Sequence, residues 1–177
     1  MDSSLVAPYK PEVSSISNQI ENEWFPTYAS KPSAAPWSSD NTIFAIFDGI
    51  NDVGNSWWLP TSSTLNAEIF AVFHGLVDQL YYAGARNFAF INVPPVDRSP
   101  SSLSNSAENQ AIEKADIAAW NAALTNMTKT LKSERPDVNI FNVDANSLFT
   151  KVLDNPASFP QTTKYKNTTQ YCEAYQK

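Results

Sequence analysis

The chain has 177 residues, a length that suits a single domain with a sizeable hydrophobic core. Hydrophobic residues make up 42% of it and charged residues 17%, which indicates a globular rather than a disordered protein. The formal net charge is −6 and Lys and Arg are not clustered, which argues against a nucleic-acid partner because such proteins neutralise phosphates with basic groups. No apolar run reaches the roughly 20 residues of a membrane span, and no zinc-ligand spacing occurs, so we expect no membrane association, metal or cofactor.

A helix and a loop are predicted before the first strand. The helix has one apolar stripe at helical spacing, formed by Val13, Ile16, Ile20 and Trp24. Residues 30–40 are rich in proline and serine, which is typical of a loop. The run Thr42–Phe47 is continuously apolar, as in a strand that is buried on both faces and paired on both edges.

Strands and helices alternate along the rest of the chain. Strands are predicted over 87–93 and 138–144, and helices over 63–84, 104–132 and 145–153. The inward side chains of the first of these helices are expected to be Ile69, Phe73, Leu76, Val77 and Leu80. Those of the second are expected to be Ile112, Ala119, Trp120, Ala123, Met127 and Leu131.

This alternation predicts one α/β domain with a parallel sheet and right-handed crossovers. In such sheets the chemistry lies beyond the carboxyl ends of the strands. Two loops would lie there, residues 48–58 after the first strand and residues 94–100 after the second. The first loop is unusually rich in Asn, Asp and Trp for a simple connection, so it is the candidate site.

Two segments carry a resemblance to a known family, namely GIND at 49–52 and GARNFAFINVPPVDRSP at 84–100. In this order, and after successive strands, they resemble the GDSL or SGNH ester hydrolases, in particular the fungal acetylesterases of carbohydrate esterase family 16. The resemblance implies a flavodoxin-like three-layer α/β/α sandwich, of which this chain would hold a part with a parallel sheet of about three strands. We expect one incomplete SGNH hydrolase-like domain over 1–177, made of a helix and loop (1–40), a βαβαβα core (41–155) and an irregular tail (156–177).

The resemblance also implies an activity and site residues. The family removes acetyl or other acyl groups from sugars or small esters with a serine nucleophile. It implies that Asn51 donates a hydrogen bond to the oxyanion, from a motif loop that contains Gly49. The nucleophile's Gly-Asp-Ser motif and the base's Asp-x-x-His motif do not occur in this sequence.

We therefore expect an incomplete copy of the enzyme with little or no activity. The alternatives are a non-catalytic carbohydrate-binding protein and a pseudoenzyme that a partner completes. Without a serine-bearing strand beside it, Thr42–Phe47 would form an exposed apolar edge through which the chain could associate.

Several residues allow two interpretations. Asn51 and Asp52 can also serve as turn or helix-cap residues. Trp57 and Trp58 either bind substrate by stacking on a sugar ring or cover the end of the sheet. The single histidine, His74, lies in the middle of a predicted helix, and we interpret it as a helix-surface or hydrogen-bonded core histidine rather than a base.

Charged residues in the two loops have local explanations. Asp97 and Arg98 are predicted to form an ion pair that fixes the second loop. Asp48 takes a position where the family usually has an apolar residue, so its charge must find solvent or a partner.

The evidence on secretion is mixed. Asn126 and Asn167 begin glycosylation triplets, and Cys172 is an unpaired cysteine that suggests a missing mate in a secreted protein. The resemblance implies an extracellular protein, whereas residues 1–10 show no signal peptide.

Overall fold

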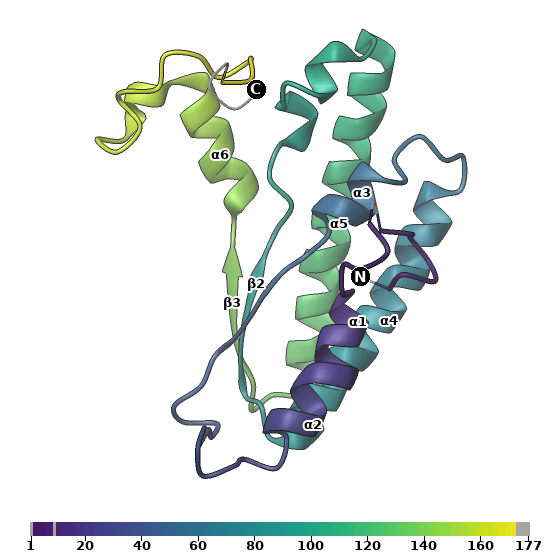
Figure 1. The fold of residues 1–177 in the computed structure, drawn as a ribbon, viewed down its shortest axis with the longest axis vertical. Helices are drawn as coiled ribbons and strands as arrows, with labels where there is room; N and C mark the ends of the chain where they lie inside the picture. Colours follow the sequence, from purple (N-terminus) through teal and green to yellow (C-terminus); the bar gives the residue numbers. More distant parts are fainter. Residues whose placement is uncertain (1, 9, 173–177) are drawn as a thin grey trace.

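A computed structural model describes residues 2–8 and 10–172 of the protein. Within these residues three strands form a parallel sheet in the order β1-β2-β3, with β1 at Phe44–Phe47, β2 at Asn87–Ile91 and β3 at Asn139–Val143. The register pairs Phe44 with Phe88 and Asn87 with Asn139. The carboxyl ends of all three strands therefore lie at one rim of the sheet, and their amino ends at the other (Figure 1). The predicted parallel sheet is confirmed.

The predicted helices occur in the predicted order, but the predicted loop at 48–58 also contains a short helix at Ile50–Gly54 that was not predicted. A first helical segment consists of α1 (Ile16–Asn18), the π-helical turn η1 (Gln19–Trp24) and α2 (Phe25–Tyr28). The remaining α-helices are α3 (Ile50–Gly54), α4 (Ser62–Ala83), α5 (Ala107–Glu134) and α6 (Ala145–Asp154). Short 3-10 turns lie at Val96–Arg98, Ser102–Ser104 and Pro156–Ser158.

Local sequence explains where these helices begin and end. The Ser106 side chain accepts a hydrogen bond from the Asn109 backbone N–H at the start of α5, and Asp144 does the same for Ser147 at the start of α6. Gly84 ends α4 with a positive φ of 111°, a conformation that glycine adopts without steric cost. None of the described helices is both long and apolar enough to span a bilayer.

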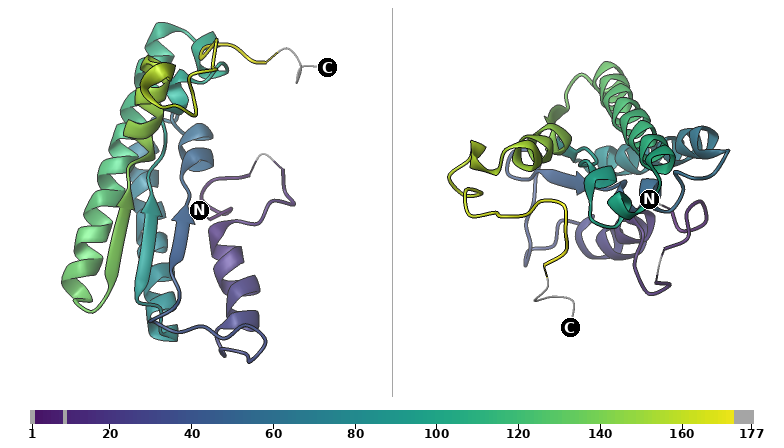
Figure 2. Two further views of the ribbon diagram at one scale, coloured as in Figure 1. Left: turned by 90° about the vertical axis from the view of Figure 1, so that its left-hand side faces the viewer. Right: turned by 90° about the horizontal axis from the view of Figure 1, so that it is seen from above.

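The core lies between the sheet and one layer of helices. Figure 2 shows α4 and α5 on one side of the sheet and the α1–α2 segment alongside β1, at the edge of the sheet. Phe88 and Phe90 of β2 point into this core with Ile69, Phe73, Leu76, Val77 and Leu80 of α4. All five side chains that were expected to point inward from α4 are therefore buried, and a sheet with helices on one face is consistent with a partial α/β sandwich.

The opposite face of the sheet is uncovered. Phe47, Phe141 and Val143 are 49%, 53% and 44% exposed, and Ala45 is exposed as well. We refer to these four residues as the bare face. The expectation that Thr42–Phe47 is buried on both faces was wrong, because only Ile46 of β1 is fully buried against the helices. The expected free edge is confirmed, since β1 pairs with β2 alone in the described sheet.

Some predicted helix faces were also wrong. Ile112 is 44% exposed and Ala119 is exposed, because the buried face of α5 includes polar residues, Glu113 and Asp116, that an apolar stripe does not reveal. Val13 is 51% exposed because the first helix begins only at Ile16.

Candidate active site

The candidate site begins where β1 ends, at Gly49. This glycine has a φ of 109°, a left-handed conformation that L side chains rarely adopt. A Cβ at this position would lie 2.4 Å from two atoms of the Trp120 indole, which is 1% exposed. Only glycine therefore fits at position 49, because of its left-handed backbone conformation and its close contact with Trp120 of α5.

Asn51 lies on the first turn of α3 and is exposed at the carboxyl end of β1. It lines a cavity of about 410 Å³ together with Asp48, Asn55 and residues of the N-terminal segment. Among the described residues its side-chain amide makes no hydrogen bond. The amide can therefore donate to an atom placed in this cavity.

Asp52, the next motif residue, is buried and only 1% exposed. Its backbone carbonyl accepts a hydrogen bond of 2.7 Å from the Ser56 hydroxyl, which holds the end of α3. This placement agrees with the interpretation of Asp52 as a structural residue of the loop.

Asp48 gives the cavity an acidic group. Burial raises the pKa of the Asp48 carboxyl, and the negative charge of Asp52 raises that pKa further. Protonation of Asp48 removes a negative charge from beside Asn51, so it favours an anion in the cavity.

The cavity contains hydroxyls but no imidazole among its described lining residues. Ser14 donates a hydrogen bond of 2.7 Å to Glu23, and the Ser15 hydroxyl accepts one from the Asn18 backbone. His74 lies elsewhere, on α4, where its Nε2 is 3.1 Å from Glu134 and its Nδ1 is 3.8 Å from Asp78. The His74 side chain is 25% exposed and lies beside two carboxylates, which agrees with its interpretation as a helix-surface or hydrogen-bonded core histidine.

The two tryptophans of the loop lie outside this cavity. Trp57 packs against the core, and Trp58 is 54% exposed. Their rings are 5.4 Å apart at an interplanar angle of 89°, an edge-to-face pair. Neither lines the cavity that holds Asn51, so a role for them in substrate binding stays a prediction.

The second loop, after β2, has different partners from those predicted. Arg98 forms an ion pair of 2.7 Å with Asp154 of α6, and no ion pair joins it to Asp97 among the described residues. The predicted Asp97–Arg98 ion pair was wrong, because the Arg98 side chain pairs with Asp154, which lies 56 residues later in the chain.

A network of asparagines supports this second loop and was missed by the sequence reasoning. Asn121 of α5 accepts from the Val93 backbone N–H and donates to the Val93 carbonyl, both at 2.9 Å. Asn92 accepts from the Asn146 backbone at 2.8 Å. The sequence does show a polar residue, Asn121, next to the inward-facing Trp120 of the predicted helix. Its hydrogen-bond partners at Val93 lie 28 residues away, so the sequence alone did not identify them. Asn92, Asn121 and Asn146 also line a second cavity of about 420 Å³.

Three further predicted residues lie on the surface. Asn126 on α5 and Asn167 in the tail are exposed, which leaves both open to modification. Cys172 is an exposed free thiol. No cluster of metal-binding side chains occurs in the part of the chain that the structure describes.

Comparison with known proteins gives a consistent result. The chain is 36% identical over 174 residues to an acetylesterase of Thermothelomyces thermophilus, which covers 97% of this chain and 57% of that protein. It is 24% and 28% identical to two GDSL esterase/lipases of Arabidopsis thaliana, over 66% of this chain and 36% of each relative. No family model matches the chain. The chain thus spans little more than half the length of the acetylesterase.

The parallel α/β sheet, the Gly49–Asp52 loop at its carboxyl rim and these matches together define the class: the chain belongs to the GDSL/SGNH ester hydrolase superfamily. Within that class, it is similar over nearly its whole length to an acetylesterase.

Proposed function

We propose that this chain contributes the oxyanion-binding loop of an acetylesterase-type hydrolase that acts on acetylated carbohydrates or small esters by acyl transfer to a serine. One observation carries the proposal. Asn51 lines a cavity at the carboxyl rim of the sheet, within the region similar to an acetylesterase, and its side-chain amide makes no hydrogen bond to the residues that the structure describes.

The chemistry assigns Asn51 a definite task. When a serine attacks an ester carbonyl, negative charge develops on the carbonyl oxygen, and a preorganised N–H donor stabilises that charge. The Nδ2–H of Asn51 would donate to this oxygen, while Gly49 and its contact with Trp120 hold the loop in place. Loss of one such donor typically lowers kcat by about 10²–10³-fold.

The described residues that line the cavity include three serine hydroxyls, those of Ser3, Ser14 and Ser15, but no histidine that could act as their base. Acyl transfer needs both a hydroxyl and a proton acceptor within hydrogen-bond reach of it. We therefore expect the chain on its own to have little or no activity, and the nucleophile and base to come from other polypeptide.

The test is a chimera in which this chain replaces the matched region of the Thermothelomyces acetylesterase. Hydrolysis of p-nitrophenyl acetate by the chimera should fall by about 10²–10³-fold in kcat after Asn51→Ala. Asn55→Ala, which alters the same cavity without removing the proposed donor, is the matched control and should have a much smaller effect.

The isolated chain should release p-nitrophenol no faster than buffer. A folded, active chimera that is indifferent to Asn51→Ala would contradict the assigned role. Turnover by the isolated chain that disappears in Asn51→Ala would contradict its expected inactivity instead.

A non-catalytic carbohydrate-binding role is the second candidate. It is favoured by the exposed face of Trp58, because aromatic rings of this kind stack on sugars. It ranks below the first candidate because Trp58 does not lie in the cavity with Asn51.

A further inference from the structure

Two Asn-x-Thr triplets, at 126–128 and 167–169, have no part in the proposed function. Such a triplet is the acceptor for an N-linked glycan, because the transferase recognises the asparagine amide together with the hydroxyl two residues later. Both asparagines are exposed, so exposure of the amide does not separate the two triplets. The surroundings of the second group, the threonine hydroxyl, do separate them.

The first triplet lies in the interior of α5. Thr128 is on the buried face of this helix and only 2% exposed. Its hydroxyl donates a hydrogen bond of 3.0 Å to the Thr125 carbonyl of the preceding turn. A transferase could reach this hydroxyl only after the helix had opened there, which would also expose the core residues Leu124 and Met127.

The second triplet lies in the tail after α6, outside the helices and strands. The Asn167 side-chain oxygen accepts hydrogen bonds from the backbone N–H groups of Thr169, at 2.8 Å, and Gln170, at 3.1 Å, which forms an Asx turn. The hydroxyl of the exposed Thr169 donates to the same oxygen at 3.1 Å. The asparagine and the hydroxyl of this triplet therefore already lie side by side at the surface.

The reacting nitrogen of Asn167 is also accessible. Among the described residues its Nδ2 makes one hydrogen bond, of 2.8 Å, to the exposed side chain of Gln170. The middle residue, Thr168, is half-buried, and its hydroxyl makes a long hydrogen bond of 3.5 Å to the Leu153 carbonyl of α6. The turn thus contacts the rest of the protein through its middle residue and leaves the two groups that a transferase needs exposed.

We propose that Asn167, and not Asn126, accepts an N-linked glycan in the folded chain. In this transfer a bond forms between Nδ2 of Asn167 and the first carbon of an oligosaccharide that is carried on a lipid diphosphate. The bond between that carbon and the diphosphate oxygen breaks, and the lipid diphosphate leaves with its electron pair. Nδ2 loses one proton to a base of the transferase.

The experiment combines the folded full chain with a purified single-subunit oligosaccharyltransferase and a lipid diphosphate-linked oligosaccharide. Mass spectrometry of the two peptides that contain Asn126 and Asn167 gives the occupancy of each site. We expect the occupancy of Asn167 to exceed that of Asn126 by about tenfold or more, because a buried helix interior seldom opens. Asn167→Gln should remove nearly all of the glycan, and Asn126→Gln should leave it in place.

Three substitutions in the tail test the hydroxyl. Thr169→Ala removes it and should abolish glycosylation of Asn167, whereas Thr169→Ser restores a hydroxyl and should keep it. Thr163→Ala is the matched control. Thr163 is an exposed threonine of the same tail, outside the triplet, whose hydroxyl donates to the Pro160 carbonyl at 3.0 Å, so its loss should not change the occupancy of Asn167.

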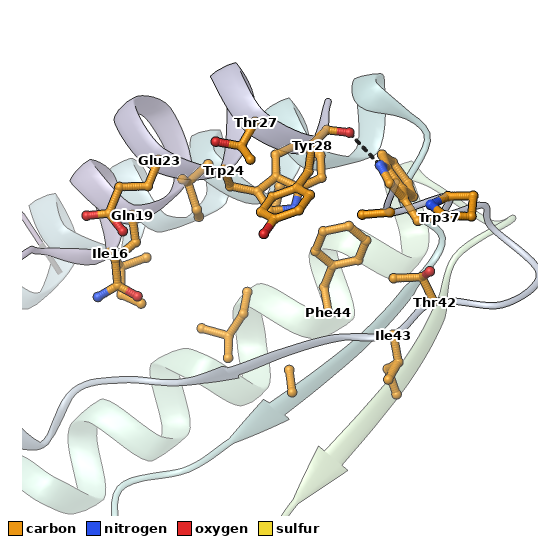
Figure 3. Close-up of a pocket in the computed structure, with 16 residues that line it drawn as sticks. Ile16, Gln19, Glu23, Trp24, Thr27, Tyr28, Trp37, Thr42, Ile43 and Phe44 are labelled. Carbon is orange, nitrogen blue, oxygen red and sulfur yellow. Dashed lines mark hydrogen bonds between the residues drawn. The ribbon is translucent and has the colours of Figure 1, made fainter. Parts of the chain in front are cut away.

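An aromatic cluster between the α1–α2 segment and β1 reports whether each variant is folded. The Trp24 and Trp37 rings are 5.4 Å apart, and each lies within 5.6 Å of the Phe44 ring (Figure 3). Fixed aromatic packing of this kind gives a near-UV circular dichroism signal that is lost when tertiary packing loosens. In a variant that keeps this signal, a change in occupancy reports on the acceptor triplet rather than on unfolding.

Three results would overturn the proposal. They are a folded chain that carries no glycan at Asn167, equal occupancy of Asn126 and Asn167 in the folded chain, and a folded Thr169→Ala variant that keeps its glycan at Asn167. Occupancy of Asn167 that disappears in Thr169→Ala and returns in Thr169→Ser, with Asn126 unmodified throughout, would support it.

Discussion

At the scale of single residues, the Asn51 loop depends on Gly49. Gly49→Ala would force an L side chain into a left-handed conformation and drive its Cβ against the Trp120 indole. We expect the free energy of unfolding to fall by about 3 kcal/mol, from backbone strain and overpacking together, as measured by urea unfolding.

Gly75 provides the control for this substitution. It lies within α4, and a Cβ there would meet no atom within 4 Å. Gly75→Ala should therefore stabilise the protein by up to about 1 kcal/mol, because alanine favours a helix interior. An unchanged unfolding midpoint in Gly49→Ala would show that the loop relaxes around the new methyl group.

The placement of residues that depends on neighbours in sequence could be predicted, and contacts with distant partners could not. Gly49 and Asn51 were predicted to follow the first strand from local sequence, whereas the role of Asn51 came only from the family resemblance and stays a prediction. The partner of Arg98 is Asp154, and the partners of Asn121 are backbone atoms of Val93 on another element. No spacing rule in a single sequence connects residues so far apart.

At the scale of elements, α5 buries two carboxyl groups. Burial raises the pKa of Glu113, whose Oε1 accepts a 2.9 Å hydrogen bond from Ser102. Burial likewise raises the pKa of Asp116, which accepts from Asn66 of α4 at 3.1 Å. Both groups therefore bind a proton more tightly in the folded protein than in the unfolded chain.

This difference fixes the sign of a pH effect. The stability that these protons contribute is complete below the ordinary pKa values, 4.5 for Glu113 and 3.8 for Asp116. It is lost as the pH rises through the raised values. We expect the urea midpoint to increase as the pH is lowered from 7 toward about 5, and the double variant Glu113→Gln, Asp116→Asn to flatten this dependence.

Glu108→Gln, at an exposed position of the same helix, serves as the control. If the double variant keeps the full pH dependence, other groups are responsible for it. The same two carboxyls explain the errors in the predicted face of α5. Apolar periodicity finds a buried helix face only where that face is apolar, and here two acidic residues occupy it.

At the scale of the whole molecule, the bare face is the largest departure from the expected three-layer sandwich. Its aromatic and aliphatic side chains are about half exposed, although they alternate correctly with the core residues of the same strands. The strands and their order along the chain could be predicted, because the hydrophobic period and the length of an apolar run are local properties of the sequence. Coverage of the second face depends on polypeptide that packs against it, which strand patterns do not reveal.

The bare face should bind a hydrophobic dye. We expect the native chain to enhance the fluorescence of anilinonaphthalene sulfonate, because exposed apolar surface binds it. The double variant Phe141→Ser, Val143→Thr should lower this signal while the unfolding free energy stays within about 0.5 kcal/mol. Tyr82→Ser removes an aromatic ring that is 74% exposed outside the bare face and should leave the signal intact. An undiminished signal in the double variant would place the dye elsewhere.

The parallel direction of the strands also separates the two rims of the molecule (Figure 1). At the amino-end rim, Arg86 before β2 and Asp137 before β3 are joined by an ion pair of 2.7 Å, and the Asp137 side chain is 54% exposed. A tether to a sensor chip or bead at Asp137 would immobilise the protein with Asn51 oriented away from the support.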